Sequence, residues 1–315
     1  MANGRMDNLI IPKPILDNIA LGYSNDVFIG TELFPEVLVD SEIGSIPVFG
    51  KEAFKVYDTS RALRGPLNKT DHGIHTFTDY KMKEHQLSSD IDKREIEAST
   101  QLDLATKAIN DNMQAIQLEK EWLIAEKAQT VTTYATDNTD TLTDNFMNES
   151  DLDPIAMIDS YASQLSDIIG RRPNTMIWGR KVWQNLKKHA KIRAYKSTAE
   201  NQMVTMEDIK NLLEMEKFLV GSSRYSTDNE TFLDVWGNAI ILAYVTPPRS
   251  NARTQYDPCF GYVLKKKGYG GTNSWWDDSG KIYTVNVDDL YDIKVVGSAS
   301  GFLIDDPIDP TEYAK

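Results

Sequence analysis

Two histidines near residue 73 are the first side chains whose type and spacing could bind a metal. His72 and His75 stand beside Asp71, and imidazole and carboxylate groups are common ligands of divalent transition metals. No third ligand follows in the same stretch, which has the glycine and asparagine content of a hairpin tip. We therefore expect solvated loop histidines, no metal site and no cofactor.

The chain offers equally little for nucleophilic or phosphate chemistry. Its single cysteine, Cys259, lacks the context of a nucleophile and is expected to be a small buried apolar residue. The segment Gly268-Tyr-Gly-Gly precedes no predicted helix, so it does not match a phosphate-binding loop. A Gly-x-Ser-x-Gly elbow is absent from the sequence. These observations predict no catalytic residue and no enzyme.

A run of cations between residues 171 and 196 is the strongest electrostatic feature. The run contains no Asp or Glu. Its basic residues are Arg171, Arg172, Arg180, Lys181, Lys187, Lys188, Lys191, Arg193 and Lys196. It could contact nucleic acid, acidic surfaces of neighbouring copies of the chain, or only water. The formal net charge of −13 favours contact between copies, since a dedicated nucleic-acid-binding protein is normally basic.

Composition and length predict a folded protein without a membrane segment. The 315 residues are 41% hydrophobic and 10% aromatic, which is enough for a core. The N-terminus lacks the apolar stretch of a signal peptide, and no run approaches the ~18 apolar residues of a membrane helix. We expect synthesis in the cytoplasm and no membrane partner.

The N-terminal third has the pattern of extended, outward-reaching segments. Residues 1–43 contain Pro12, Pro14 and Pro35, which forbid long helices across them, so they are predicted to form an arm. Residues 44–90 are polar, with turn formers near residues 65–73 between two segments of strand character. This pattern predicts a long two-stranded hairpin. Such a ribbon is marginal alone in water, so it should lean on another surface.

One long helix is predicted at residues 102–129. Its apolar residues recur at helical spacing at Leu102, Ala105, Ile109, Met113, Ile116 and Leu123. About 28 residues would span roughly 40 Å, whereas a mean helix has ~11–12 residues. A coiled-coil strand is the alternative, but the apolar seam lapses at Lys120 and ends by Thr130.

Helices and strands alternate after residue 150. Asp153 followed by Pro154 predicts a helix start, and Thr205 with Asp208 predicts a capping box. The predicted helices span residues 154–169, 181–190 and 206–215. The predicted strands span residues 175–178, 218–221, 239–245, 260–264, 282–287 and 291–304. The fold class is therefore α+β, with an α/β unit in the second half.

This order of parts resembles the major capsid protein of tailed bacteriophages, with the HK97-like fold. The arm, the polar hairpin and the long helix are similar to the family's N-terminal arm, extended loop and spine helix. Asn174-Thr-Met-Ile-Trp-Gly-Arg-Lys-Val-Trp-Gln-Asn-Leu is similar to the strand, turn and helix of its axial domain. The closing strands after residue 285 are similar to those that return to its peripheral domain. The resemblance covers nearly the whole chain and is architectural, since no short motif in it is diagnostic.

The resemblance implies domains, partners and a location. The domains would be an arm at 1–43, an extended loop at 44–90, a peripheral domain at 91–152 and 281–315, and an axial domain at 153–280. The protein would assemble with itself into hexamers, pentamers and an icosahedral shell around double-stranded DNA. Scaffolding, portal and decoration proteins would be further partners, with non-specific DNA contact at the inner surface. The location would be the virion, after assembly in the host cytoplasm.

Two alternatives stay open at the level of sequence. A bacterial nanocompartment shell of the same fold would enclose enzymes rather than DNA. An oligomeric α/β enzyme would use the hairpin only for oligomerisation, and would require a polar cluster in a pocket. Lys51, Lys55 and Lys69 could supply the lysine of the covalent cross-link known in some relatives, but no matching asparagine or glutamate is identified. The sequence therefore leaves open whether the subunits are covalently cross-linked.

Overall fold

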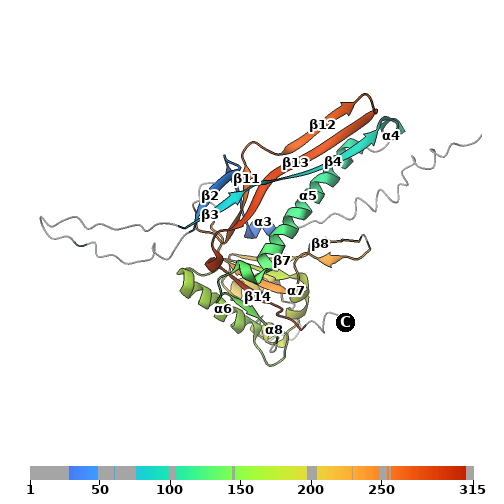
Figure 1. The fold of residues 1–315 in the computed structure, drawn as a ribbon. Coiled ribbons are helices and arrows are strands. Elements are labelled where there is room, and N and C mark those ends of the chain that lie inside the picture. The colour runs from blue at the N-terminus through green and yellow to red at the C-terminus, as the bar shows by residue number, and fades with distance from the viewer. Residues whose placement is uncertain are drawn as a thin grey trace, which may run out of the picture.

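Two five-stranded β-sheets, joined by one long helix, make up most of the described part of the protein (Figure 1). In the computed structural model the described residues are 28–48, 60, 76–98, 104–143, 146–196, 204–228, 230–247, 254 and 257–309. The expected arm before residue 28, the tip of the hairpin and the histidines His72 and His75 lie outside these ranges. No helix within the described residues combines the length and the apolar character that crossing a bilayer requires.

The first sheet is organised around its longest strand, β13. Its members are β1 (Glu36–Val39), β4 (Lys83–Asp92), β11 (Gly261–Lys266), β12 (Gly271–Asp277) and β13 (Ile282–Val295). Strands β11 and β12 pair in succession along one edge of β13, and β4 pairs along the other edge. Strand β1 adds to β11 in parallel. The last residues of the predicted arm therefore belong to a sheet.

Helix α5 (Leu104–Gln129) packs along β13 and β4 of this sheet (Figure 1). At about 1.5 Å per residue its 26 residues span roughly 39 Å. The predicted end at Gln129 is confirmed, and the predicted start at residue 102 lies outside the described residues. The buried face differs from the predicted stripe: Met113 is 40% exposed, while Lys120 and Glu121 are buried. A shorter helix, α4 (Lys93–Ala98), follows β4.

The second sheet has strands in the order β5-β14-β10-β6-β7. Their bounds are β5 (Thr139–Thr141), β14 (Gly301–Asp305), β10 (Ala239–Ala243), β6 (Thr175–Gly179) and β7 (Lys217–Gly221). The helices of this half are α6 (Pro154–Ile169), α7 (Arg180–Leu186), α8 (Ala190–Lys196) and α9 (Met206–Leu212). Every residue of β6 and β10 is buried, because helices pack on one face and α5 with the first sheet on the other.

Both predicted helix starts in this half are confirmed. The side chain of Asp153 accepts hydrogen bonds from the backbone N–H groups of Ile155 and Ala156, and Pro154 occupies the first turn. Gly170 ends α6 with φ of 69°, a left-handed conformation that glycine adopts without strain. Thr205 and Asp208 form the predicted capping box at the start of α9.

Several predicted elements are wrong in their extent. The helix expected at 206–215 ends at Leu212, and β13 runs without a break through the gap expected between residues 287 and 291. The helix expected at 181–190 ends at Leu186, and a second helix, α8, begins at Ala190. The strand expected at 291–304 is divided by the 3₁₀ turn at Ser298–Ser300. Its first part continues β13 in the first sheet, and its second part is β14 in the second sheet. Gly297 and Gly301 flank the turn, and an added Cβ on either would lie 2.4 Å from a neighbouring side chain.

Sheet membership also differs from the domain boundaries expected from the sequence. Strands β11 and β12 fall inside the expected axial segment 153–280, yet they pair with β13. Strand β14 falls inside the expected peripheral segment 281–315, yet it pairs with β10. The chain therefore crosses between the two sheets more often than the domain boundaries expected from the sequence would require.

The described residues also form two short hairpins, a short helix and a 3₁₀ turn at Val131–Thr133. Strands β2 (Ile43–Val48) and β3 (Thr76–Lys81) pair antiparallel and form the base of the expected hairpin. Strands β8 (Arg224–Tyr225) and β9 (Leu233–Asp234) form a second, short hairpin beside α5. Helix α3 (Gly30–Leu33) precedes β1 and contacts α5.

Candidate functional site

The basic run of residues 171–196 is distributed over the covering helices of the second sheet. Two of its cations precede β6, two open α7, two follow the last turn of α7 and three lie on α8 (Figure 1). Helix α7 buries Val182, Trp183 and Leu186 against the sheet. The apolar side of α7 therefore faces the core. Four cations of these helices and of the turn between them are exposed: Lys181, Lys188, Lys191 and Arg193.

The first two cations of the run have partners within the same chain. Arg171 donates a hydrogen bond to the hydroxyl of Tyr244 over 2.6 Å, and its guanidinium lies 5.3 Å from the centre of that ring. Arg172 forms an ion pair with Asp159 and approaches Glu214 within 3.8 Å. These contacts fix the loop between α6 and β6, which is a structural role.

Further along the run, some cations have partners and others form no ion pair within the described residues. Lys181 lies 3.7 Å from Asp234. Among the described residues, four cations of the run form no ion pair with another described side chain: Arg180, Lys187, Lys188 and Lys191. Lys187 and Lys188 follow the C-terminal end of α7, where a cation is favourable beside the helix dipole. We call the part of the surface that carries Arg180, Lys187, Lys188 and Lys191 the α7–α8 corner.

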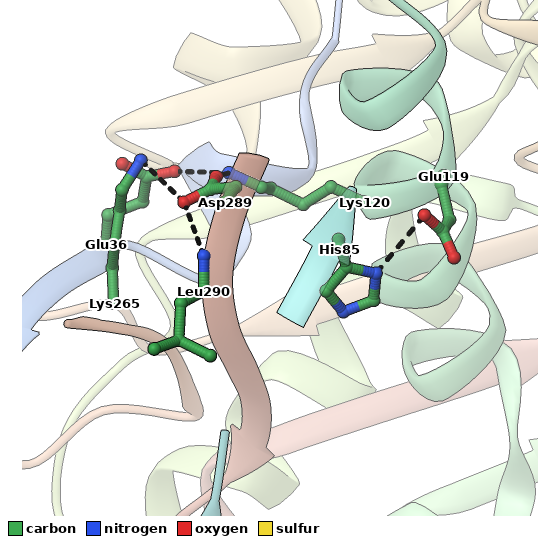
Figure 2. Close-up of polar contacts among 7 residues, drawn as sticks. All are labelled: Glu36, His85, Glu119, Lys120, Lys265, Asp289 and Leu290. Atoms are coloured by element: carbon green, nitrogen blue, oxygen red, sulfur yellow. Dashed lines mark hydrogen bonds and ion pairs between the residues drawn. The ribbon is translucent and has the colours of Figure 1, made fainter. Parts of the chain in front are cut away.

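A second polar site, absent from the sequence prediction, lies where α5 crosses the first sheet (Figure 2). The ammonium group of Lys120 lies 3.0 Å from Glu36 of β1 and 3.1 Å from Asp289 of β13. Asp289 also accepts from Lys265 of β11 over 2.9 Å. The side chains of Lys120 and Asp289 are only 10% and 12% exposed. We call these four residues the spine network, because they join the long helix to three strands.

Charge compensation within the spine network opposes the cost of burial. Burial alone would lower the pKa of Lys120, but the carboxylates of Glu36 and Asp289 raise it, and the net pKa lies above its ordinary value. Burial alone would raise the pKa of Asp289. The hydrogen bond from Lys265 and the charge of Lys120 outweigh this effect, and the net pKa lies below its ordinary value. Both groups are therefore charged at neutral pH, and each stabilises the other.

A pair of stacked aromatic rings lies beside the spine network. The imidazole of His85 stacks on the ring of Tyr291, with centroids 4.1 Å apart and an angle of 8° between the planes. The ammonium group of Lys120 lies 4.8 Å from the centre of the same ring. Nδ1 of His85 lies 3.2 Å from Glu119, the neighbour of Lys120 on α5 (Figure 2).

Glu121, which follows Lys120 on α5, forms hydrogen bonds to two other parts of the chain. Its carboxylate accepts hydrogen bonds from the backbone N–H groups of Ile29 at 3.0 Å and Gly30 at 2.7 Å. It also accepts from the indole N–H of Trp236 at 2.7 Å. Burial raises the pKa of Glu121, and these hydrogen bonds act in the opposite direction. One buried carboxylate therefore holds helix α3, α5 and the loop before β10 together.

The end of α5 makes a similar connection. The side chain of Gln129 donates to the carbonyl of Val235 over 3.0 Å and accepts from the N–H of Gly237 over 2.8 Å. Together with Glu121, this amide joins the long helix to the loop that leads into β10. The contacts make α5 a rigid connector between the two sheets.

The sequence carries a sign of the buried charges at Lys120 and Glu121, but the pattern of apolar residues alone does not reveal it. Lys120 and Glu121 interrupt the apolar stripe of the helix, and an interruption there predicts either an exposed turn or buried charges. The partners of Lys120 are 84 and 169 residues away in the chain. Only the tertiary fold brings them together.

Comparison with known proteins gives the chain a relative over almost its full length. It is 37% identical over 304 residues to the major capsid protein of Burkholderia phage BcepMu, a match that covers 96% of this chain and 98% of that protein. A comparison with protein-family models gave no match.

Solved structures show the same architecture. The crystal structure of a phage-related protein from Bordetella bronchiseptica is 28% identical, has a TM-score of 0.74, and matches 94% of this chain and 97% of that one. The capsid structure of cyanophage P-SCSP1u has a TM-score of 0.58 at 12% identity, over 96% of this chain and 98% of that one. At that identity the second likeness bears on the fold alone.

Proposed function

The chain belongs to the family of phage major capsid proteins, and we propose that it is the subunit that builds an icosahedral phage shell around double-stranded DNA. The end-to-end similarity to the major capsid protein of phage BcepMu carries this conclusion. The expected α+β, HK97-like fold is confirmed by the matching capsid architecture. The protein is a structural, self-assembling component of the virion and not an enzyme.

The contacts within the chain suit a shell subunit. A subunit that occupies several slightly different positions in a shell needs a rigid frame with adaptable extensions. The spine network, Glu121 and Gln129 make α5 and the two sheets such a frame. The base of the β2–β3 hairpin and the α7–α8 corner lie at the periphery of this frame (Figure 1).

The α7–α8 corner is proposed as a contact to an acidic surface of a neighbouring subunit. Four of its cations form no ion pair within the described residues, and the chain as a whole carries a formal charge of −13. Unpaired cations on one copy would relieve repulsion between such acidic copies. DNA is the other candidate partner for the same cations.

Charge variants distinguish contact with a neighbouring subunit from contact with DNA. Lys188→Glu combined with Lys191→Glu should lower the yield of shells and leave the unfolding midpoint of the subunit unchanged, because both lysines are exposed. The matched control is Lys188→Arg with Lys191→Arg, which keeps the charge. Shells formed in normal yield by the glutamate variant would contradict a contact between subunits. If those shells also retained less nucleic acid, the cations would instead contact DNA.

Further partners and the division into domains are part of the same proposal. Separate scaffolding, portal and decoration proteins would direct and complete the shell, which would assemble in the host cytoplasm. The parts of the expected arm (1–43) and hairpin (44–90) other than β1 and β4 would extend from a peripheral domain built on α5 and the first sheet. The axial domain would contain the second sheet, including β14, and the peripheral domain would include β11 and β12 of the first sheet.

A nanocompartment shell is the alternative within the same architecture. Sedimentation and negative-stain microscopy of the protein, expressed with and without a candidate scaffold, test shell formation directly. Particles isolated from phage lysates should then contain nuclease-protected double-stranded DNA. Particles that contain an enzyme and no protected DNA would contradict the phage assignment while leaving shell assembly intact.

A further inference from the structure

The outer edge of the first sheet ends in a strand that is exposed along its whole length. Every residue of β12, Gly271–Asp277, is exposed, and among the described strands it pairs only with β13. Figure 1 shows β12 at the margin of the long ribbon that it forms with β13 and β4. The backbone groups on its outer side therefore have no partner strand among the described residues.

Strand β12 lacks the features that usually protect an edge. Its sequence is Gly-Thr-Asn-Ser-Trp-Trp-Asp, with no lysine and no proline. Its register with β13 runs without a break from Gly271 to Asp277, so no bulge interrupts it. Trp275 and Trp276 are 50% and 42% exposed. An unprotected edge with two exposed tryptophans is typical of a strand that is covered in an assembly.

The sequence of β12 is compatible with pairing to itself. In an antiparallel pair centred on Ser274, the acidic Asp277 lies opposite Gly271 of the second copy, so no like charges face each other. Trp275 then lies opposite Asn273 and diagonal to the second Trp275 on the same face, within reach of an aromatic contact. The centre of the pair brings the two Ser274 hydroxyls together.

We propose that β12 pairs antiparallel with β12 of a second copy, about a two-fold axis through Ser274. The two ribbons then form one continuous sheet that crosses from subunit to subunit. This inference rests on the proposed shell, since a self-pairing edge requires a second copy. The interface is small, and stable protein interfaces bury about 1,200–2,000 Å² in total, so one pair alone holds two subunits weakly. Repetition over a shell would make the contact effective.

Cysteine cross-linking tests both the pairing and its register. Ser274→Cys places two thiols on directly opposite residues, where Cα atoms are about 4.5–5.5 Å apart and a disulfide can form. Thr272→Cys is the matched control on the same strand and face, since its two copies would be offset by four residues, or about 13 Å. The native Cys259 is 3% exposed, so it does not compete.

In shells under mild oxidation, Ser274→Cys should give about ten-fold more disulfide-linked dimer than Thr272→Cys. Shells in which neither variant cross-links would overturn the pairing and leave the proposed function intact. Cross-linking of Thr272→Cys equal to that of Ser274→Cys would overturn the register. Wild-type protein that never forms shells would contradict the proposed function and the pairing together.

A second measurement needs no substitution and covers the case in which Ser274→Cys prevents assembly. Hydrogen exchange of the wild-type protein should show slower exchange of the β12 amides in shells than in unassembled subunits. Equal exchange in the two states would overturn the pairing, because a paired strand protects the amides at its interface.

Discussion

Replacement of Gly30 by alanine tests how the N-terminal segment docks on the long helix. Gly30 is the first residue of α3, and its N–H donates to the buried carboxylate of Glu121. From helix propensity alone, Gly30→Ala should stabilise the protein by about 0.5–1 kcal/mol. The surroundings predict the opposite, because an added Cβ would lie 2.6 Å from Oε2 of Glu121 and 3.0 Å from Cδ1 of Ile124.

The expected loss follows from two costs and one gain. Displacing the N–H of Gly30 from Glu121 removes a hydrogen bond to a charged group, at about 1.5–3 kcal/mol. Crowding against Ile124, which is fully buried, costs about 1–3 kcal/mol. After subtraction of the propensity gain, the free energy of unfolding should fall by about 1.5–5.5 kcal/mol.

Urea unfolding of the unassembled subunit, followed by tryptophan fluorescence, measures this loss. The matched control is Gly271→Ala, where an added Cβ meets nothing within 4 Å. The two variants change the unfolded chain alike, so their difference reports the folded state. A Gly30→Ala subunit as stable as the control would refute the docking of α3 on Glu121.

The spine network and one helix cap give three further predictions. Lys120→Met should lower the free energy of unfolding by roughly 3 kcal/mol because Asp289 and Glu36 lose a buried cation. Lys265→Met, on a more exposed lysine, should lower it by only about 1 kcal/mol. Urea titrations compare the two variants, and equal losses would contradict the buried position of Lys120. Since the pKa of Asp289 is lowered in the fold, its carboxylate stabilises the protein above its ordinary pKa, and this stability is lost as pH falls below about 4. Asp289→Asn should therefore flatten the pH dependence of the unfolding midpoint there, and an unchanged slope would refute the assigned shift. Asp153→Ala should cost about 1 kcal/mol through loss of the α6 cap, measured by thermal unfolding, and a neutral result would contradict the cap geometry.

Local signals in the sequence predicted the local parts of the fold. Helix α6 could be placed because its cap, Asp153 with Pro154, depends on neighbouring residues alone. The break between β13 and β14 was missed, although Gly297 and Gly301 with the serines between them carry the turn composition that marks it. In that case the signal was present, and the apolar run on either side outweighed it.

The polar sites could be predicted only in part. The composition of the sequence revealed the basic run. It could not show which cations have ion-pair partners within the chain, because the partners of Arg172 and Lys181 lie in other elements. The spine network was missed because a charged residue at a buried helical position weakens the apolar pattern. Lys120 is tolerated there only because two distant carboxylates meet it in the folded chain.

A cryo-electron-microscopy map of the particles formed by this chain is the sharpest test of its assignment as a shell subunit. We expect a closed icosahedral shell in which this fold repeats as the subunit of hexamers and pentamers. The long helix α5 and the ribbon of β4, β13 and β12 should be traceable in each copy. A protein that stays monomeric under all assembly conditions, with and without scaffold, would contradict this assignment.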